Sequence, residues 1–259
     1  MKKVLSIAGS DPSGGAGIQA DIKTITAHKH YAMAVIVSLT AQNTTAVSGV
    51  LDCLPEFVES QIDSVLSDIT PDAIKLGMLS NANIMHSVAK MLKQYNCKNI
   101  VLDPVMVATT GGRLMDDNAL GVYIDELFAL ARVVTPNLPE ASVLSGIEIK
   151  NIDDMRAAAI KISSYGCQSV LIKGGHFVGN ATDLLYENGE FTEFSAIKID
   201  TKNTHGTGCT LSSAIACNIA SGLNVKDSVK NAKDYVTNAL KNTIAIGHGN
   251  GPINHCWNL

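Results

Sequence analysis

Short apolar runs alternate with longer segments of helical periodicity along most of this 259-residue chain. The runs are rich in Val, Ile, Leu and Ala, as in strands buried on both faces, and the other segments repeat apolar residues every three to four positions. We expect strands at residues 4–8, 32–39, 73–77, 99–103, 132–135 and 169–173, and helices at 16–28, 56–66, 82–92, 119–130, 139–144, 153–164, 210–220 and 225–244. This alternation predicts an α/β fold, with a central, mostly parallel sheet and helices on both faces.

Two further extended segments, at residues 183–186 and 191–199, flank the sequence Glu-Asn-Gly-Glu at 187–190. Asn-Gly between extended segments is a hairpin signal. The sequence contains no low-complexity linker and no internal repeat. We therefore expect residues 1–259 to form a single domain.

The composition limits the classes of partner. The formal net charge is −4 without a basic run, and aromatic residues make up 5% of the chain, which argues against nucleic acid and anionic membranes. No apolar run approaches the ~18 residues of a membrane-spanning helix, and the first residues do not resemble a signal peptide. Six scattered cysteines without a C-x-x-C pair favour reduced thiols. These features predict a cytoplasmic protein.

The most informative motif is Thr-His-Gly-Thr-Gly-Cys-Thr at residues 204–210, directly before a small-residue run of helical spacing. Glycines let backbone N–H groups turn to one side, and a helix start adds unpaired N–H groups and the positive end of its dipole. The motif predicts an anion hole with Cys209 at its mouth. A thiol in that position is expected to have a lowered pKa. The alternative is a glycine-rich turn with a buried structural cysteine.

A second glycine-rich stretch follows the first expected strand. Residues 9–14 have the glycine spacing of a Walker A loop, but Gly15 occupies the position of the required lysine. Residues 15–20 match G-x-G-x-x-A, yet the next strand leads into Thr-Ala-Gln-Asn instead of a ribose-binding acid. Neither nucleotide motif is therefore complete, and we expect the loop to close around a small ligand.

Polar and glycine residues recur where the expected strands end. They are Gly9–Asp11, Gln42, Gly77–Met78, Asp103, Asn137 and Lys173–Gly175. Ligands of parallel α/β sheets bind at the carboxyl ends of the strands. We therefore expect one site at this edge.

Taken together, seven segments resemble, in order, the ribokinase-like superfamily, and within it the hydroxymethylpyrimidine/phosphomethylpyrimidine kinases of thiamine biosynthesis. They lie at residues 8–21, 41–44, 75–79, 101–106, 135–141, 173–176 and 203–210. The resemblance implies a kinase that uses ATP and Mg²⁺ and a homodimeric assembly. It also implies two substrates, 4-amino-5-hydroxymethyl-2-methylpyrimidine and then its monophosphate, which becomes the diphosphate.

The resemblance also implies roles for individual residues. Cys209 would take the proton of the substrate hydroxyl, and the amides of Thr207, Gly208 and Cys209 would hold the transferring phosphoryl group. Asp103 would hold Mg²⁺ through water, and Lys173 would pair with phosphate oxygens.

Two further nucleotide-side assignments have structural alternatives. Asn137 and Glu140 resemble the element of the family that governs Mg²⁺ and phosphate, but they also suit an ordinary helix start. Lys233 matches a nucleotide-side lysine loosely, and otherwise belongs to a solvated helix face. Lys173 has the comparable alternative of an exposed strand end.

For the organic substrate, Gln42 is the discriminating residue. Its amide offers a donor beside an acceptor, which suits the amino group and ring nitrogen of an aminopyrimidine. Asp21 and Gly9 would lie near the substrate, and Met78 would pack against the ring, unless it is a core residue. His205 is expected to shape its loop and not to act as a base.

Three other functions remain open. A pyridoxal kinase of the same cysteine-containing branch is the nearest, although such kinases tend to lack the Ala-Gln-Asn-Thr segment found here at residues 41–44. The other two are a non-catalytic binding protein on this scaffold and a hydrolase with Cys209 as nucleophile.

Overall fold

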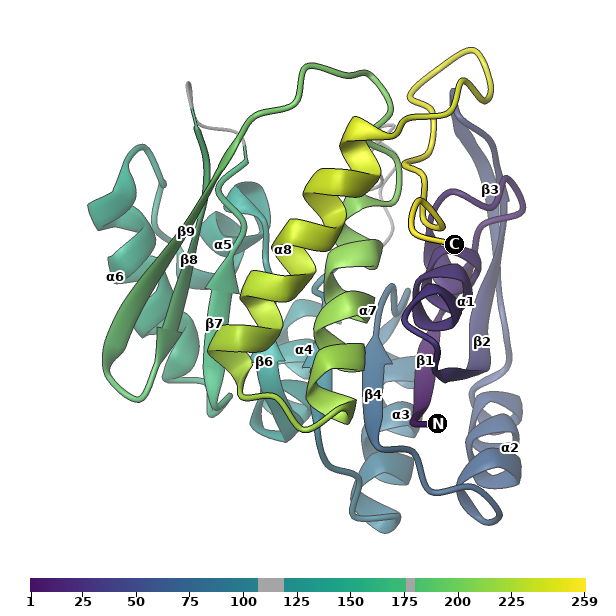
Figure 1. Cartoon of the computed structure of the whole chain (residues 1–259). Helices are drawn as coiled ribbons and strands as arrows, with labels where there is room; N and C mark the ends of the chain where they lie inside the picture. Colours follow the sequence, from purple (N-terminus) through teal and green to yellow (C-terminus); the bar gives the residue numbers. More distant parts are fainter. Residues whose placement is uncertain (107–118, 176–179) are drawn as a thin grey trace.

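The computed structural model describes residues 1–106, 119–175 and 180–259 (Figure 1). Its strands are β1 (Lys3–Ser10), β2 (Tyr31–Gln42), β3 (Val47–Asp52), β4 (Ala73–Leu76), β5 (Ile100–Leu102), β6 (Ala131–Val134), β7 (Ser169–Ile172), β8 (Asn180–Glu187) and β9 (Glu190–Ile197). They form one sheet in the order β3-β2-β1-β4-β5-β6-β7-β8-β9. The pairs from β2 to β7 are parallel, and β3, β8 and β9 join antiparallel at the two ends. The predicted α/β architecture is confirmed.

The helices are α1 (Gly17–Ala27), α2 (Pro55–Leu66), α3 (Ala82–Gln94), α4 (Ala119–Leu127) with the 3₁₀ turn η1 (Phe128–Leu130), α5 (Leu138–Ser145), α6 (Ile152–Ser163), α7 (Thr207–Ala220) and α8 (Val225–Lys241). Buried residues of α2 to α6 form one apolar cluster with the sheet, and those of α1, α7 and α8 form a second. In Figure 1, α7 and α8 cross in front of the central strands. The sheet therefore has helices on both faces, as predicted.

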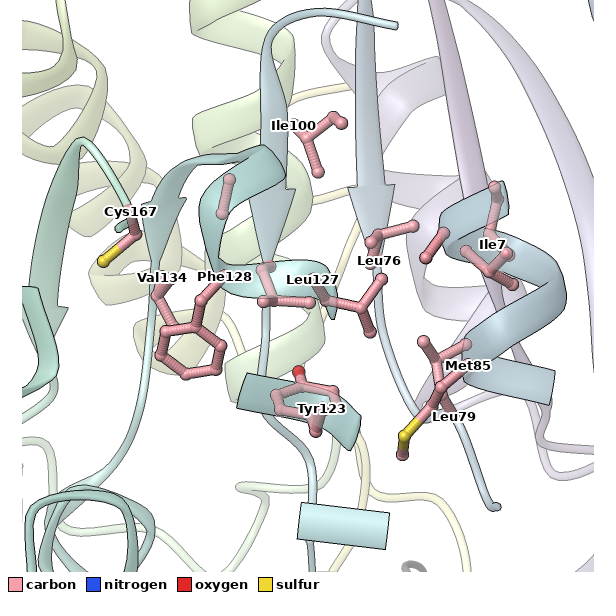
Figure 2. Packing of buried hydrophobic residues seen from close by; sticks show 14 of the residues in the cluster. Ile7, Leu76, Leu79, Met85, Ile100, Tyr123, Leu127, Phe128, Val134 and Cys167 are labelled. Atoms are coloured by element: carbon pink, nitrogen blue, oxygen red, sulfur yellow. The ribbon is translucent and has the colours of Figure 1, made fainter. Parts of the chain in front are cut away.

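The central strands supply both clusters because successive side chains point to opposite faces. Ile74 and Leu76 of β4 belong to the first cluster, and Ala73 belongs to the second. Figure 2 shows Tyr123 and Phe128 of the first cluster packed against the strands, on the sheet face that α2 to α6 cover. These all-buried strands fix the edge at which the polar strand ends meet.

The structure differs from the expected elements at an exposed strand, which was not predicted, and at a helix that starts earlier than expected and has no side-chain cap. Strand β3 was not predicted; its sequence, Val-Ser-Gly-Val-Leu-Asp, breaks the apolar residues with Ser and Gly, and five of its six residues are exposed. Helix α7 begins three residues earlier than expected, at Thr207, because Gly206 adopts a left-handed φ of 81° at the N-cap. Such a φ is open to glycine at little cost.

Two predictions about chemistry and membranes can be compared with the fold. All six cysteines are free thiols, as their scatter indicated. Within residues 1–106, 119–175 and 180–259, no helix has the length and apolarity needed to cross a bilayer. The cytoplasmic location and the single domain remain predictions.

Candidate active site

A cavity of about 800 Å³ opens at the carboxyl edge of the parallel strands. Residues of β1, β2, β8 and β9 contribute to its wall, together with residues that follow β4, β5 and β7, the first turn of α7 and one face of α8. Of the residues that the sequence assigned to a site, those lining the cavity are Gly9, Gln42, Met78, Asp103, Asn137, Glu140, Lys173, Thr207, Gly208, Cys209 and Lys233. Asp21 is not among the lining residues. His176, in one of the seven family-like segments, lies outside the described residues.

Helix α7 begins at the cavity wall. A Cβ atom on Gly206 would collide with the carbonyl oxygen of Gly15, so two segments far apart in sequence meet here through a glycine. No side chain caps the helix. The Thr207 amide donates to the Thr204 carbonyl at 3.2 Å, whereas the described residues supply no backbone acceptor for the Gly208 and Cys209 amides. The predicted three-amide anion hole is thus reduced to two available amides.

Cys209 corrects a second expectation from the sequence. Burial raises the pKa of its thiol to about 11, although the nearby Lys75 ammonium and an N–H of Gly17 both act to lower it. The predicted lowered pKa is wrong, because desolvation of the thiolate outweighs the helix N-terminus and the lysine. In the unliganded protein Cys209 is therefore a thiol near neutral pH.

Lys173 and Asp103 form an ion pair at the cavity wall, with 2.8 Å between Nζ and Oδ1. The side chain of Lys173 is 16% exposed, which rules out the alternative of an exposed strand end. Asp103 also accepts hydrogen bonds from the hydroxyls of Thr135 and Ser212. Although burial acts to raise the pKa of Asp103, Lys173 and Lys75 hold it below its usual value.

A second ion pair joins α8 to the sheet. Lys233 Nζ lies 2.6 Å from Asp183 Oδ2, and the Lys233 side chain is 11% exposed. The alternative of a solvated helix face is therefore wrong for Lys233. Asp183 also accepts from the Gly174 amide at 3.0 Å, so this carboxylate ties the segment after β7 to the same wall.

Asn137 and Glu140 confirm the helix-start interpretation, and their role toward Mg²⁺ and phosphate stays a prediction. They form a capping box at the start of α5, in which each side chain accepts from the other residue's amide, at 2.9 and 2.8 Å. Glu140 is nevertheless buried at the cavity, where burial raises its pKa to about 7 against the effect of Lys173. The capping box thus holds the Glu140 carboxyl at the cavity, where the charge of Lys173 acts on it.

Asp21 lies beneath the cavity and not at its surface. Its Oδ2 accepts from Lys75 Nζ at 2.8 Å and from the Ser6 hydroxyl, and its Oδ1 accepts from Ser213 of α7 at 2.7 Å. Both Asp21 and Lys75 have fully buried side chains. Asp21 is predicted to lie near the substrate, but in this structure its two oxygens are occupied by these donors and it is not among the residues that line the cavity. A lysine within an apolar strand was the missed signal, since a buried ammonium needs such a partner.

The other end of the cavity contains the residues expected to contact the organic substrate. A Cβ atom on Gly9 would lie 3.2 Å from the sulfur of Met78, so these two residues pack together at the wall. His205 is buried, with Nε2 2.8 Å from Asp11 Oδ2 and 3.3 Å from the Gln42 side-chain nitrogen. This end of the cavity therefore has an apolar wall at Gly9 and Met78 beside the polar side chains of Gln42 and His205.

Comparison with known proteins gives consistent matches over nearly the whole chain. Residues 11–254 match the family model for phosphomethylpyrimidine kinase. The hydroxymethylpyrimidine/phosphomethylpyrimidine kinases of Bacillus subtilis and Escherichia coli are each 42% identical, over 98% of this chain and 94% and 98% of their own lengths.

Some relatives are longer. The thiamine biosynthesis bifunctional protein ThiED of Geobacter sulfurreducens is 46% identical, and a probable thiamine biosynthetic bifunctional enzyme of rice is 44% identical. The chain spans about half the length of these two relatives, 52% and 48%.

Solved structures include two kinds of kinase. The phosphomethylpyrimidine kinase of Clostridium difficile 630 matches with a TM-score of 0.83 at 42% identity, covering 93% of this chain and all of that one. The pyridoxal kinase of Bacillus subtilis, solved with ADP, matches with a TM-score of 0.92 at 38% identity, covering 98% and 97%.

Proposed function

The chain belongs to the phosphomethylpyrimidine kinase family, and from that premise we propose that it phosphorylates the hydroxymethyl group of 4-amino-5-hydroxymethyl-2-methylpyrimidine with ATP. The product monophosphate is then phosphorylated again, which gives the diphosphate used in thiamine biosynthesis. One observation carries this proposal: two uncommitted amides, Cys209 and the Lys173–Asp103 pair share one cavity with Gln42.

The α7 end of the cavity suits phosphoryl transfer. The Gly208 and Cys209 amides stabilise charge on the transferring group, which is the main electrostatic requirement of such chemistry. Cys209, as the thiolate, accepts the hydroxyl proton as the substrate oxygen attacks the γ-phosphorus and the bond to the β-phosphate oxygen breaks, which releases ADP. Because its thiol has a pKa of about 11, Cys209 must first lose its own proton, and the rate should rise with pH above neutrality.

The nucleotide phosphates meet Lys173 and Lys233, whose ammonium groups line the same cavity. Asp103, through water, and Glu140 would hold Mg²⁺, since kinases bind it with one or two carboxylates and the phosphates of the nucleotide. No group of three His, Cys, Asp or Glu side chains able to hold a metal occurs among the described residues. When bound, Mg²⁺ would neutralise phosphate charge.

Gln42 selects the substrate ring, and Met78 packs against it. The second candidate function is phosphorylation of pyridoxal, favoured by the similarity in shape to the Bacillus subtilis pyridoxal kinase. A homodimer and a cytoplasmic location, which the resemblance and the composition predict, are part of the proposal and are checked by light scattering and by fractionation.

Incubation with γ-labelled ATP and one candidate alcohol at a time tests the proposal. We expect label on the aminopyrimidine, first as the monophosphate and then as the diphosphate. Label on pyridoxal alone would establish the second candidate. Binding without transfer would indicate a non-catalytic protein, and loss of an acyl group from an ester substrate with no label transferred would indicate a hydrolase.

A further inference from the structure

We infer that His205 is a positioning residue that, held by Asp11, fixes the orientation of the Gln42 amide and thereby sets which ring the cavity accepts. The inference rests on the proposed function and deepens it. It concerns the contacts among Asp11, Gln42 and His205, which lie far apart in the sequence.

His205 is held in place independently of Gln42. The backbone N–H of His205 donates to the Gly251 carbonyl at 3.1 Å, and the backbone carbonyl of His205 accepts from the Ile253 amide at 3.3 Å. The imidazole is 2% exposed and fills the space beside Gly15, where a Cβ atom would collide with it. The C-terminal segment and the glycine-rich loop therefore leave the ring a single position.

Asp11 determines which ring nitrogen of His205 carries hydrogen. Its oxygens accept from the amides of Ser13, Gly15 and Ala16 at 2.8–3.1 Å, and these donors favour the carboxylate. A carboxylate only accepts, so the His205 Nε2 that lies 2.8 Å from it must be the donor. The opposite tautomer would place a lone pair against a carboxylate and a hydrogen on Nδ1, which is buried without a partner among the described residues.

This tautomer decides how the Gln42 amide is turned. The two ends of the amide lie 3.3 Å from His205 Nε2 and 3.4 Å from the Thr40 hydroxyl, which itself donates to the Ser10 carbonyl. Oxygen and nitrogen of a glutamine are assigned from such a network. The single hydrogen on Nε2 goes mainly to Asp11, and the longer contact to Gln42 shares it. An N–H edge favours the Gln42 oxygen over the Gln42 NH₂ group on that side, and the Thr40 oxygen then accepts from the Gln42 nitrogen.

These two contacts leave one lone pair and one N–H of the amide for a ligand, and Gln42 lines the cavity. An aminopyrimidine complements them with its amino N–H and the adjacent ring nitrogen. Pyridoxal lacks the amino group and cannot offer the same pair. Without a donor at His205, the Gln42 side-chain amide can rotate by a half-turn and exchange its oxygen and nitrogen. The protein molecules with the rotated amide then no longer complement the aminopyrimidine.

Two variants of the same residue test the inference. His205→Gln keeps an N–H donor near Nε2, and His205→Leu removes it. We expect His205→Leu to lower the ratio of kcat/KM for the pyrimidine to kcat/KM for pyridoxal by about tenfold, the equivalent of ~1.4 kcal/mol. The ratio for His205→Gln should stay within about twofold of wild type. An unchanged ratio in His205→Leu would overturn the inference.

Two controls separate positioning from general damage. His255→Asn alters the neighbouring contact, 3.1 Å from the Gly15 carbonyl, and should leave the ratio unchanged whatever it does to the rate. In a Gln42→Leu background, His205→Leu should produce no further change in the ratio, because the amide it orients is gone. A ratio that falls equally in both backgrounds would show that His205 acts without Gln42.

A long-range ¹H–¹⁵N spectrum of the wild-type protein gives a readout that needs no activity. Hydrogen on Nε2 of His205 supports the inference, and hydrogen on Nδ1 alone contradicts it, even if the Leu variant does not fold. If the wild-type protein phosphorylates no pyrimidine, the proposed function fails by itself, and the spectrum still decides the tautomer.

Discussion

Two lysine–aspartate pairs lie close to α7, and they have the same 2.8 Å separation in different surroundings. Lys75–Asp21 is completely enclosed and has serine hydroxyls on the aspartate. Lys173–Asp103 borders the cavity, and its lysine retains 16% exposure. The enclosed pair cannot exchange partners with a ligand, whereas the pair at the cavity can.

Cys209 responds to both pairs. Lys75 acts to lower its pKa, while Asp21 and Asp103 act with burial to raise it. Ser212 and Ser213, one turn further along α7, donate to Asp103 and Asp21 respectively. The two carboxylates therefore hold the first turns of the helix from two directions. The comparison predicts that substituting the lysine of the enclosed pair mainly lowers stability, whereas substituting the lysine of the pair at the cavity mainly lowers activity.

The largest effect is expected from Cys209→Ala, which removes the proton acceptor between the pairs. Loss of a general base costs ~10²–10⁴-fold in kcat, and the fold should persist because both ion pairs remain. Steady-state kinetics and thermal unfolding of the same preparation measure the two effects. Retention of half the wild-type kcat would exclude Cys209 as the base, as would a wild-type kcat that is flat between pH 7 and 9.

Next comes the contrast between Lys75→Met and Lys173→Met. Removing one partner of a buried pair costs about 3–5 kcal/mol, so Lys75→Met should lose that much unfolding free energy in urea. Lys173→Met should lose less, because a cation or water can reach Asp103 from the cavity, and its main defect should be in kcat/KM for ATP. If both variants lost the same stability, the distinction between the pairs would be wrong. Lys75→Met combined with Asp21→Asn is the matched control, since it leaves no unpaired charge.

Gly208→Ala tests whether the first turn of α7, beside the Lys173–Asp103 pair, binds phosphate. A Cβ atom there would lie 3.4 Å from Lys173 Nζ and 3.7 Å from Asp103, so it fits but enters the space for phosphate. We expect kcat to fall by ~10²–10³-fold, as when one aligned donor is lost. Stability should be unchanged or higher, since Ala favours a helix over Gly. Unchanged kcat with altered stability would indicate a structural turn.

The smallest effect concerns Glu140, beside the pair at the cavity. Burial raises its pKa to about 7, so its protonated form is favoured by folding. That contribution to stability is complete below the unfolded pKa near 4.5 and is lost as the pH rises through 7. Glu140→Gln should therefore flatten the decrease in stability between pH 5 and 8 in urea titrations. An identical pH dependence in the variant would rule Glu140 out as its source.

The sequence was sufficient for features that local pattern determines. Buried strands, amphipathic helices and the polar strand ends follow from periodicity and topology, and they predicted the parallel core and the edge that carries the cavity. The glycines around Thr207 likewise predicted a helix start with uncommitted amides. These features depend on neighbours within a few residues.

The remaining features depend on contacts between distant segments. Asp21 and Lys75 are 54 positions apart, and the sequence does not show that one neutralises the other. The pKa of Cys209 depends on how fully the surrounding chain excludes water, so the helix N-terminus alone predicted the wrong direction. Strand β3 was missed because its apolar residues, Val47, Val50 and Leu51, are interrupted by Ser and Gly and form neither a run nor an alternation.

Substrate choice is tested most directly by Gln42→Leu, assayed on the pyrimidine and on pyridoxal with the same ATP and Mg²⁺. Leucine has a similar volume but cannot hydrogen-bond, and an unpaired buried polar group costs ~1–3 kcal/mol. We predict that kcat/KM for the pyrimidine falls by roughly 5- to 150-fold and that the loss for pyridoxal is much smaller. Equal losses, or a larger loss for pyridoxal, would contradict the assignment of this cavity to an aminopyrimidine.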